Sequence, residues 1–421
     1  MKMILRKTPI FALLISLLFF ISCDDDTDSL TPETEVEEEM EEEEEMESVP
    51  IVLIESTQLI IKSSGDLQTF LKQSGLAIDT EKLIYNVSVW RVTYKTVYKG
   101  DTITASTMVF TPETTDEVST ISFQHGTIAD NASAPTEAGI NDGSIILYSA
   151  IASGGFVTVV PDFVGFGASV EFVHPYYHEY YTATSIVNAI YASKQLVESH
   201  ELNIDNDLYL AGYSQGGYAT MATHKYFEEE GMDFYNLKAS FPSSGGYDVS
   251  GMSNYFLVQE TYHQPFFLGF VAMSYKTSYD FAETMGHFFN EPYATEIPEM
   301  FFGSFSGDQI NERLTTNISD FLTEGFLNSS AGDADYAFIY DLFEDNSLLD
   351  WTPTIRMYMY HGDADITVPY QNSVDSYAKL LGNGASESIV TFETFSGATH
   401  GTGVGPYIES FIPEILNLEQ R

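Results

Sequence analysis

Leu208-Tyr209-Leu210-Ala211-Gly212-Tyr213-Ser214-Gln215-Gly216 joins an apolar strand to the pattern G-x-S-x-G, and the helical stretch 215–229 follows at once. A serine between such a strand and such a helix occupies a strained turn, and glycines two residues before and after it leave room for the backbone. Its hydroxyl then lies at a helix N-terminus, whose dipole favours developing negative charge. The context, more than the five-residue pattern, predicts that Ser214 is a nucleophile.

Strands and helices alternate on both sides of this turn. The β-branched and aromatic stretches 87–94 and 103–110, separated by Lys99-Gly100-Asp101, predict an antiparallel hairpin. Further predicted strands are 119–124, 156–160, 207–211, 237–242, 355–360 and 388–393, and predicted helices are 182–199, 215–229 and 404–418. This order predicts an α/β fold with a mostly parallel central sheet flanked by helices, whose active site lies at the carboxyl ends of the strands.

The alternation is interrupted from about residue 249 to residue 350. This segment is rich in Phe and Tyr and contains Pro265, Pro292 and Pro298. We expect a largely helical cap, inserted between the strands predicted at 237–242 and 355–360. Residues 49–421 would then form one domain that carries this insertion.

A candidate acid follows the strand Arg356-Met357-Tyr358-Met359-Tyr360, in the sequence His361-Gly362-Asp363-Ala364-Asp365-Ile366-Thr367-Val368-Pro369. A carboxylate at the end of such a strand can orient a histidine. The arrangement H-G-x-x-D-x-x-V-P resembles the acid-bearing turn of α/β-hydrolases, and the match selects Asp365 and makes Asp363 a turn residue. The alternative is that both aspartates only belong to a surface loop.

A candidate base is selected by its order in the chain. The order in such hydrolases is serine, acid, histidine. Of the nine histidines, only His400 follows Asp365, and it lies in the small-residue loop Ser396-Gly397-Ala398-Thr399-His400-Gly401. His400 would take the proton of Ser214 and return it to the leaving group, while Asp365 fixes the tautomer of the imidazole.

An oxyanion hole needs two backbone N–H groups. One is expected from Gln215, the residue after the nucleophile, and the other from the loop Gln124-His125-Gly126-Thr127. Gly126 and Thr127 are the candidates in that loop, and the sequence leaves open which N–H in 126–128 points inward. His125 is expected to act through its backbone position.

Residues from about 84 to 418 resemble the secreted lipase/esterase type of α/β-hydrolase. The resemblance rests on His125-Gly126-Thr127, Pro161-Asp162-Phe163-Val164-Gly165-Phe166-Gly167, His174-Pro175-Tyr176 and the three candidate catalytic residues. Bacterial lipases and acyl esterases related to fungal secretory lipases share this signature. The resemblance implies hydrolysis of carboxylic esters through an acyl-enzyme intermediate, with no cofactor and no metal, and a structural role for Asp162.

Two other functions fit the same fold. A serine peptidase of the prolyl-oligopeptidase kind has the same triad, but residues 1–83 are too short for its β-propeller. A noncatalytic binding protein on this fold usually lacks a member of the triad, whereas all three residues are present here. Labelling by a fluorophosphonate would separate an enzyme from a binding protein.

The cap supplies candidates for the substrate pocket. Residues 266–273, Phe-Phe-Leu-Gly-Phe-Val-Ala-Met, are a nearly unbroken apolar run. Because acyl pockets are mainly apolar, we expect Phe266, Phe267 and Phe270 to line one. The expected preference is for short to medium acyl or aromatic esters over charged ones. The alternative is that these rings form the core of the cap itself.

The first residues predict export. Lys2, Arg6 and Lys7 precede an apolar run that ends in Phe20-Ile21-Ser22-Cys23, and Cys23 is the only cysteine. The run is shorter than the roughly 20 residues of a membrane-spanning helix and suits a signal peptide over residues 1–22. Its end resembles a bacterial lipobox, with Phe20 where leucine is usual. We therefore expect lipidation at Cys23.

A strongly acidic segment follows Cys23. Residues 24–48 contain Asp24-Asp25-Asp26 and a Glu-rich tract, a composition too polar to pack a core, and we expect residues 23–48 to be a lipidated, disordered stalk. An acidic run after a lipobox resembles the surface-export signal of Bacteroidetes lipoproteins. The resemblance implies an outer-membrane lipoprotein displayed on the cell surface.

The charge of the chain limits its partners. It has 62 Asp and Glu against 17 Lys and Arg, which repels nucleic acid and anionic membrane surfaces. The partners expected are therefore a small-molecule or lipid ester as substrate and a membrane through the lipid anchor. Disulfides within the chain are excluded by the single cysteine. The histidines show no metal-binding spacing, and the sequence leaves the oligomeric state open.

Overall fold

The computed structural model describes residues 52–232 and 234–419. The predicted signal peptide, the lipidation site Cys23 and the acidic stalk lie outside the described residues. Among the helices of the described part of the chain, none combines the length and apolarity that crossing a bilayer requires.

One sheet of nine strands organises the described residues, in the order β1-β2-β3-β5-β4-β6-β7-β8-β9. The pairs from β1 to β5 in this order are antiparallel, and all pairs from β5 to β9 are parallel. The fold class predicted from the sequence is confirmed. The strands are β1 (Leu53–Lys62), β2 (Val87–Tyr98), β3 (Asp101–Pro112), β4 (Val118–Gln124), β5 (Phe156–Pro161), β6 (Ile204–Tyr213), β7 (Asn236–Ser243), β8 (Arg356–Gly362) and β9 (Val390–Phe395).

The sheet opens with the predicted hairpin, β2 and β3, which is longer than expected. Tyr98 pairs with Asp101, so that Lys99 and Gly100 form a two-residue turn in which both φ angles are positive, 53° and 84°. Glycine is suited to this turn because it carries no Cβ. The sequence analysis missed β1, which pairs with β2 at the edge of the sheet.

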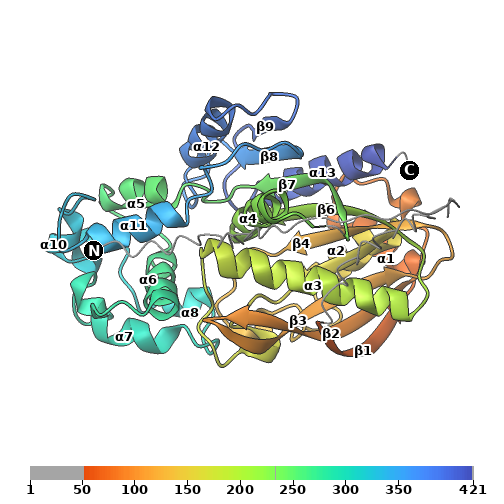
Figure 1. Ribbon diagram of the computed structural model, residues 1–421, viewed down its shortest axis with the longest axis horizontal. Coiled ribbons are helices and arrows are strands. Elements are labelled where there is room, and N and C mark those ends of the chain that lie inside the picture. The colour runs from red at the N-terminus through yellow and green to blue at the C-terminus, as the bar shows by residue number, and fades with distance from the viewer. Residues whose placement is uncertain (1–51, 233, 420–421) are drawn as a thin grey trace, which may run out of the picture. The chain divides into compact units, whose positions relative to one another are not determined.

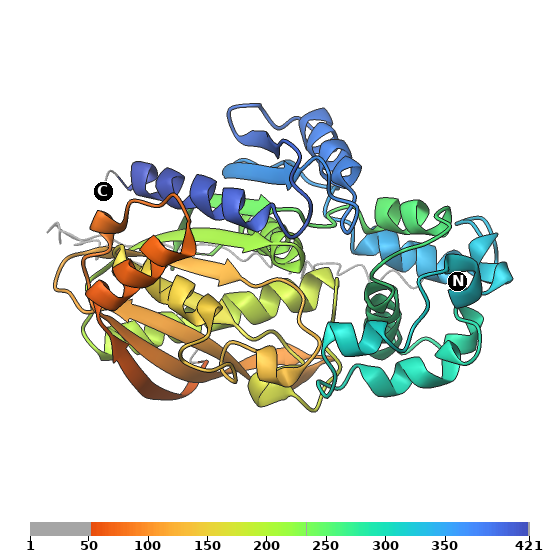
Figure 2. The same ribbon diagram turned by 180° about the vertical axis from the view of Figure 1, so that it is seen from behind.

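Helices cover both faces of the sheet (Figures 1 and 2). On one face lie α3 (Glu179–Ser199) and α4 (Gln215–Glu230), and on the other lie α1 (Ser64–Ser74), α2 (Gly143–Ser153) and α13 (Val404–Leu418). A further helix, α12 (Tyr370–Gly382), packs against β8 and β9. The two faces bury separate apolar clusters, which is the arrangement of a sheet buried on both sides.

A group of helices replaces the strand–helix alternation between β7 and β8. In Figure 1 these helices lie together beside the left end of the sheet. They are α5 (Val249–Leu257), α6 (Phe266–Tyr279), α7 (Tyr293–Met300), α8 (Gly307–Asn311), α9 (Ile318–Phe321), α10 (Glu324–Leu327) and α11 (Ala337–Asp345). We call residues 249–345 the cap.

Candidate active site

Ser214 lies between β6 and α4 in a conformation that a non-glycine residue rarely adopts, with φ 62° and ψ −125°. Its N–H donates a hydrogen bond of 2.9 Å to the carbonyl oxygen of Ser243 at the end of β7. A Cβ on Gly216 would come within 1.9 Å of the carbonyl oxygen of Gln124, and one on Gly212 within 2.3 Å of that of Gly216. The glycines of the G-x-S-x-G pattern are therefore required by backbone contacts on both sides of the serine.

Three side chains from the ends of different strands form a hydrogen-bonded series. The distance from His400 Nε2 to Ser214 Oγ is 2.8 Å, and that from His400 Nδ1 to Asp365 Oδ2 is 2.6 Å. Asp365 follows β8 and His400 follows β9. Because a carboxylate oxygen only accepts, Nδ1 carries the hydrogen, and Nε2 is left to accept the hydrogen of the serine hydroxyl.

Asp365 is held by its own turn. Its Oδ1 accepts hydrogen bonds from the N–H groups of Thr367 (2.8 Å) and Val368 (3.1 Å), and its Oδ2 also lies 3.1 Å from His361 Nε2. Burial alone would raise the pKa of Asp365, but the hydrogen bonds from His361 and His400 outweigh burial and lower that pKa to about 2. Asp365 is therefore a carboxylate at neutral pH.

Asp363 has a different environment, although it lies only two residues away. Its side chain is exposed, and Oδ1 accepts a hydrogen bond of 2.6 Å from the N–H of Gly397. It thereby links the turn after β8 to the loop that carries His400. Of the two aspartates, only Asp365 contacts His400.

The loop after β4 lies against the serine. A Cβ on Gly126 would be 3.7 Å from the Cβ of Ser214. Within residues 52–232 and 234–419, the N–H groups of Gly126, Thr127 and Gln215 donate no hydrogen bond to protein. Two or more unpaired N–H groups beside a nucleophilic oxygen are what an oxyanion requires. Thr127 is further held by a side-chain hydrogen bond of 2.9 Å to the hydroxyl of Tyr176.

The Pro161–Gly167 signature contains a buried acid, Asp162, whose side-chain hydrogen bonds go to residues other than Ser214, Asp365 and His400. Asp162 is inaccessible to solvent and accepts hydrogen bonds from Ser106 Oγ (2.5 Å) and from the N–H and hydroxyl of Thr136. Burial raises the pKa of Asp162 to about 6, although these hydrogen bonds act against it. The contacts tie β3 and the loop near Thr136 to the end of β5, in keeping with the structural role implied by the resemblance.

A large apolar cavity opens at Ser214. It contains about 970 Å³ of space free of protein atoms, part of it open to solvent. Ser214, Tyr176, Tyr177 and Val368 border it from the sheet side. The cap supplies most of the remaining lining, including Val249, Met252, Phe256, Phe267, Leu268, Val271, Ala272, Phe288, Phe289, Ile339 and Phe343.

Only one of the three predicted pocket residues lines this cavity. Phe267 does so, together with its helical neighbours Leu268 and Val271. Phe266 and Phe270 do not, and the prediction is corrected for them: they lie one turn apart on the opposite side of α6 and are buried, Phe270 against Phe301 of the cap and Tyr176 outside it. Phe270 stacks on Tyr176 with ring centroids 4.6 Å apart and an angle of 12° between the rings.

Sequence reasoning gave no role to several residues that contact the site. Tyr176 and Tyr177 line the cavity, although the His174-Pro175-Tyr176 motif was quoted only as part of a signature. The hydroxyl of Tyr213 donates a hydrogen bond of 2.7 Å to the carbonyl oxygen of His400 and so holds the loop of that histidine. The role of Tyr213 could have been inferred from its place at the first variable position of G-x-S-x-G, because a tyrosine there can reach a neighbouring loop.

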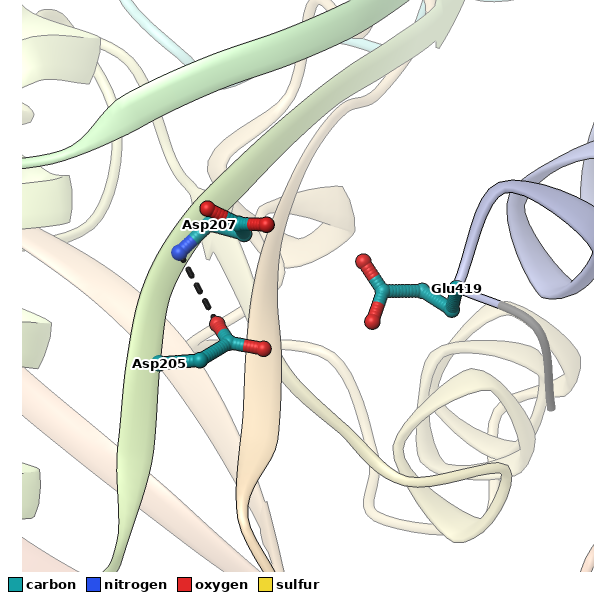
Figure 3. A group of neighbouring side chains, drawn as sticks. All are labelled: Asp205, Asp207 and Glu419. Atoms are coloured by element: carbon teal, nitrogen blue, oxygen red, sulfur yellow. Dashed lines mark hydrogen bonds between the residues drawn. The ribbon is translucent and has the colours of Figure 1, made fainter.

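One group of carboxylates in the described residues has metal-ligand spacing, but it lies away from this site. Asp205 and Asp207 at the amino end of β6 and Glu419 after α13 have oxygens within 4.8 Å of one another (Figure 3). Ser119 Oγ donates to Asp205 (2.7 Å), Tyr209 to Glu419 (2.5 Å), and Lys238 pairs with Asp207 (3.2 Å). Ser214 lies beyond the opposite end of the same strand.

The sheet is mostly parallel with an antiparallel start, and a serine, an acid and a histidine follow β6, β8 and β9 in that order. These features define the α/β-hydrolase fold. Residues 135–228, which include Ser214, match the family model described as secretory lipase. No curated protein matches the chain in sequence.

Solved structures of similar fold include hydrolases and lipases. A putative hydrolase from Legionella pneumophila is 24% identical, with a TM-score of 0.77, over 87% of this chain and 98% of its own. The rice cell wall degrading esterase LipA from Xanthomonas oryzae is 23% identical, with a TM-score of 0.75, over 88% of this chain and 99% of its own. Candida antarctica lipase A is 17% identical, with a TM-score of 0.60, over 83% of this chain and 77% of its own. These likenesses establish the fold of the chain.

Proposed function

We propose that this chain is a serine hydrolase that cleaves carboxylic esters through an acyl-enzyme intermediate. The observation that carries the proposal is the hydrogen-bonded series Ser214–His400–Asp365 at the wall of an apolar cavity. The match of residues 135–228 to the secretory lipase model and the esterases and lipases among the solved structures support it.

The geometry is suited to acyl transfer. His400 Nε2 takes the proton of Ser214 as Oγ attacks the ester carbonyl carbon, and the carbonyl oxygen becomes an oxyanion beside the N–H groups of Gln215 and the Gly126–Thr127 loop. The bond to the alcohol oxygen breaks as His400 returns its proton to that oxygen. Water, deprotonated by His400, then attacks the acyl-enzyme and releases the acid, which restores the Ser214 hydroxyl.

The lining of the cavity favours an uncharged acyl group. Almost every side chain from the cap is aliphatic or aromatic, and no Lys, Arg, Asp or Glu is among the lining residues. Each buried methylene contributes roughly 0.8 kcal/mol, so a cavity of this kind rewards an alkyl or aromatic acyl chain and penalises a carboxylate. We therefore keep the expectation of a short to medium acyl or an aromatic ester.

A fluorophosphonate and a panel of nitrophenyl esters test the proposal. The wild type should label at Ser214 and hydrolyse the esters, and Ser214→Ala should lose labelling and about 10⁶-fold in kcat. Ser253→Ala is the matched control, because Ser253 lines the same cavity without a hydrogen bond to His400. Cleavage of peptide amides in preference to the esters would indicate a peptidase, and a chain that neither labels nor hydrolyses would be a binding protein.

We also propose that the chain is exported and anchored by lipid at Cys23. The support is the sequence of residues 1–48 together with the match to the secretory lipase model. Two or three acyl chains anchor a protein stably where one does not. Cys23→Ala should release active enzyme into the soluble fraction, and protease treatment of intact cells should remove the wild type from the surface. A wild type that is already soluble would contradict lipidation.

A further inference from the structure

His361 is the last residue but one of β8 and is fully buried, yet the reaction described above gives it no role. Its Nε2 lies 3.1 Å from Asp365 Oδ2 and 3.1 Å from the carbonyl oxygen of Val368. Its Nδ1 lies 2.6 Å from the hydroxyl of Ser373 on α12. Both polar atoms of this ring are therefore engaged, and one of them contacts the acid of the proposed triad.

The partners of His361 determine its tautomer. A carboxylate oxygen and a carbonyl oxygen both accept, so the nitrogen between them, Nε2, must carry the hydrogen. In the neutral ring Nδ1 is then an acceptor, and the hydroxyl of Ser373 donates to it. Ser373 thus presents the Nε2–H of His361 to Asp365.

With this donor, the carboxylate of Asp365 is surrounded by hydrogen-bond donors. Two backbone N–H groups contact Oδ1, and two imidazole N–H groups, from His361 and His400, share Oδ2. We propose that His361 is a positioning residue: it holds Oδ2 of Asp365 in the orientation that His400 needs during acyl transfer. This proposal rests on the proposed function. Burial raises the pKa of Asp365, and the hydrogen bond from His361 is the first of the causes that lower it, followed by the hydrogen bond from His400.

The chain contains a closely matched control in His224. This histidine is also fully buried, its Nδ1 lies 2.6 Å from Ser240 Oγ, and its Nε2 lies 2.8 Å from a carboxylate four residues further on, Glu228. It has no hydrogen bond to Ser214, Asp365 or His400. Loss of His224 should therefore reproduce the folding cost of removing such a histidine without its effect on the reaction.

The test compares His361→Leu and His361→Gln with His224→Leu, using ester hydrolysis and the rate of fluorophosphonate labelling. We expect His361→Leu to lower kcat and the labelling rate about 10- to 100-fold with KM nearly unchanged, the factor typical of a hydrogen bond to a charged group. His361→Gln, whose amide can donate near the position of Nε2, should recover most of the loss. His224→Leu should lower Tm and leave kcat unchanged.

A double variant separates positioning from general structure. If His361 acts through the carboxylate, His361→Leu should cost nothing further in an Asp365→Asn background. An equal loss in both backgrounds, or wild-type kcat in His361→Leu, would overturn the inference. If the leucine variant does not fold, His361→Asn replaces it, because its shorter amide reaches only toward the position of Nδ1. Equal activity of the Asn and Gln variants would then refute positioning.

A spectroscopic measurement is independent of turnover. The proton between His400 Nδ1 and Asp365 should give a far-downfield NMR resonance in the wild type. It should shift in His361→Leu and stay in place in His224→Leu; an unchanged resonance in both counts against the inference. A wild type that shows this resonance but neither labels nor hydrolyses esters contradicts the proposed function and leaves the positioning of Asp365 supported.

Discussion

Replacing Asp365 with asparagine changes one oxygen to an NH₂ group and reverses the polarity of the most important contact in the site. Oδ1 is held by the N–H groups of Thr367 and Val368 and must remain an oxygen. The new NH₂ group therefore takes the place of Oδ2 and faces the Nδ1–H of His400 at 2.6 Å. Two donors cannot form this hydrogen bond, so His400 must move its hydrogen to Nε2, where it blocks acceptance of the serine proton.

The expected loss is about 10⁴-fold in kcat, or about 5.5 kcal/mol of transition-state stabilisation, with little change in KM. Asp363→Asn is the matched variant. Its amide oxygen can still accept from the N–H of Gly397, and it does not contact His400, so kcat should stay close to that of the wild type. Steady-state hydrolysis of a nitrophenyl ester, with burst titration of active sites, measures both. If Asp363→Asn proves the more damaging change, the assignment of the acid is wrong.

Three other outcomes follow from the structure. Phe267→Ala should shift the preference toward longer acyl chains by a few-fold per methylene in kcat/KM, measured with a panel of esters. Phe270→Ala, which removes a buried ring, should cost about 3–5 kcal/mol of unfolding free energy, measured by urea unfolding, without moving the chain-length optimum. Gly216→Ala forces a Cβ against the carbonyl of Gln124 and should abolish activity, and a soluble, fully active variant would contradict the geometry of the turn. Burial lowers the pKa of His174 to about 3, from about 6.5 in the unfolded chain. The stability that the neutral imidazole contributes is therefore fully present above pH 6.5 and is lost as the pH falls toward 3, with about 3 kcal/mol of unfolding free energy lost by pH 4.5. In urea unfolding, the stability of His174→Gln should depend less on pH than that of the wild type.

Helices and strands with a strong apolar pattern could be predicted from the sequence, whereas the irregular edge strand β1 could not. The stretches 156–160 and 208–211 are buried on both faces and consist of consecutive apolar or β-branched residues, which indicates a strand directly. β1 was missed because it lies at the edge, is largely exposed, and changes register near Glu55 and Ile60, so that its alternation is broken. Its position depends on β2, a partner that local sequence does not reveal.

The sequence by itself determined the fold class and the three residues of the hydrogen-bonded series. The turn around Ser214 needs its glycines locally, and the order of serine, acid and histidine along the chain left a single histidine after Asp365. Those choices depend on backbone chemistry and on chain order, both of which are visible without a structure.

Only the tertiary structure decided which side chains surround that series. Phe266 and Phe267 are adjacent in an apolar run, but the direction in which α6 packs turns one ring into the cap and the other into the cavity. His361 likewise is only the first residue of the acid-bearing turn in the sequence, and the packing of β8 and α12 brings Asp365 and Ser373 to its two nitrogens. Apolar and polar patterns specify that a residue is buried, whereas the partner it is buried against depends on how distant elements pack.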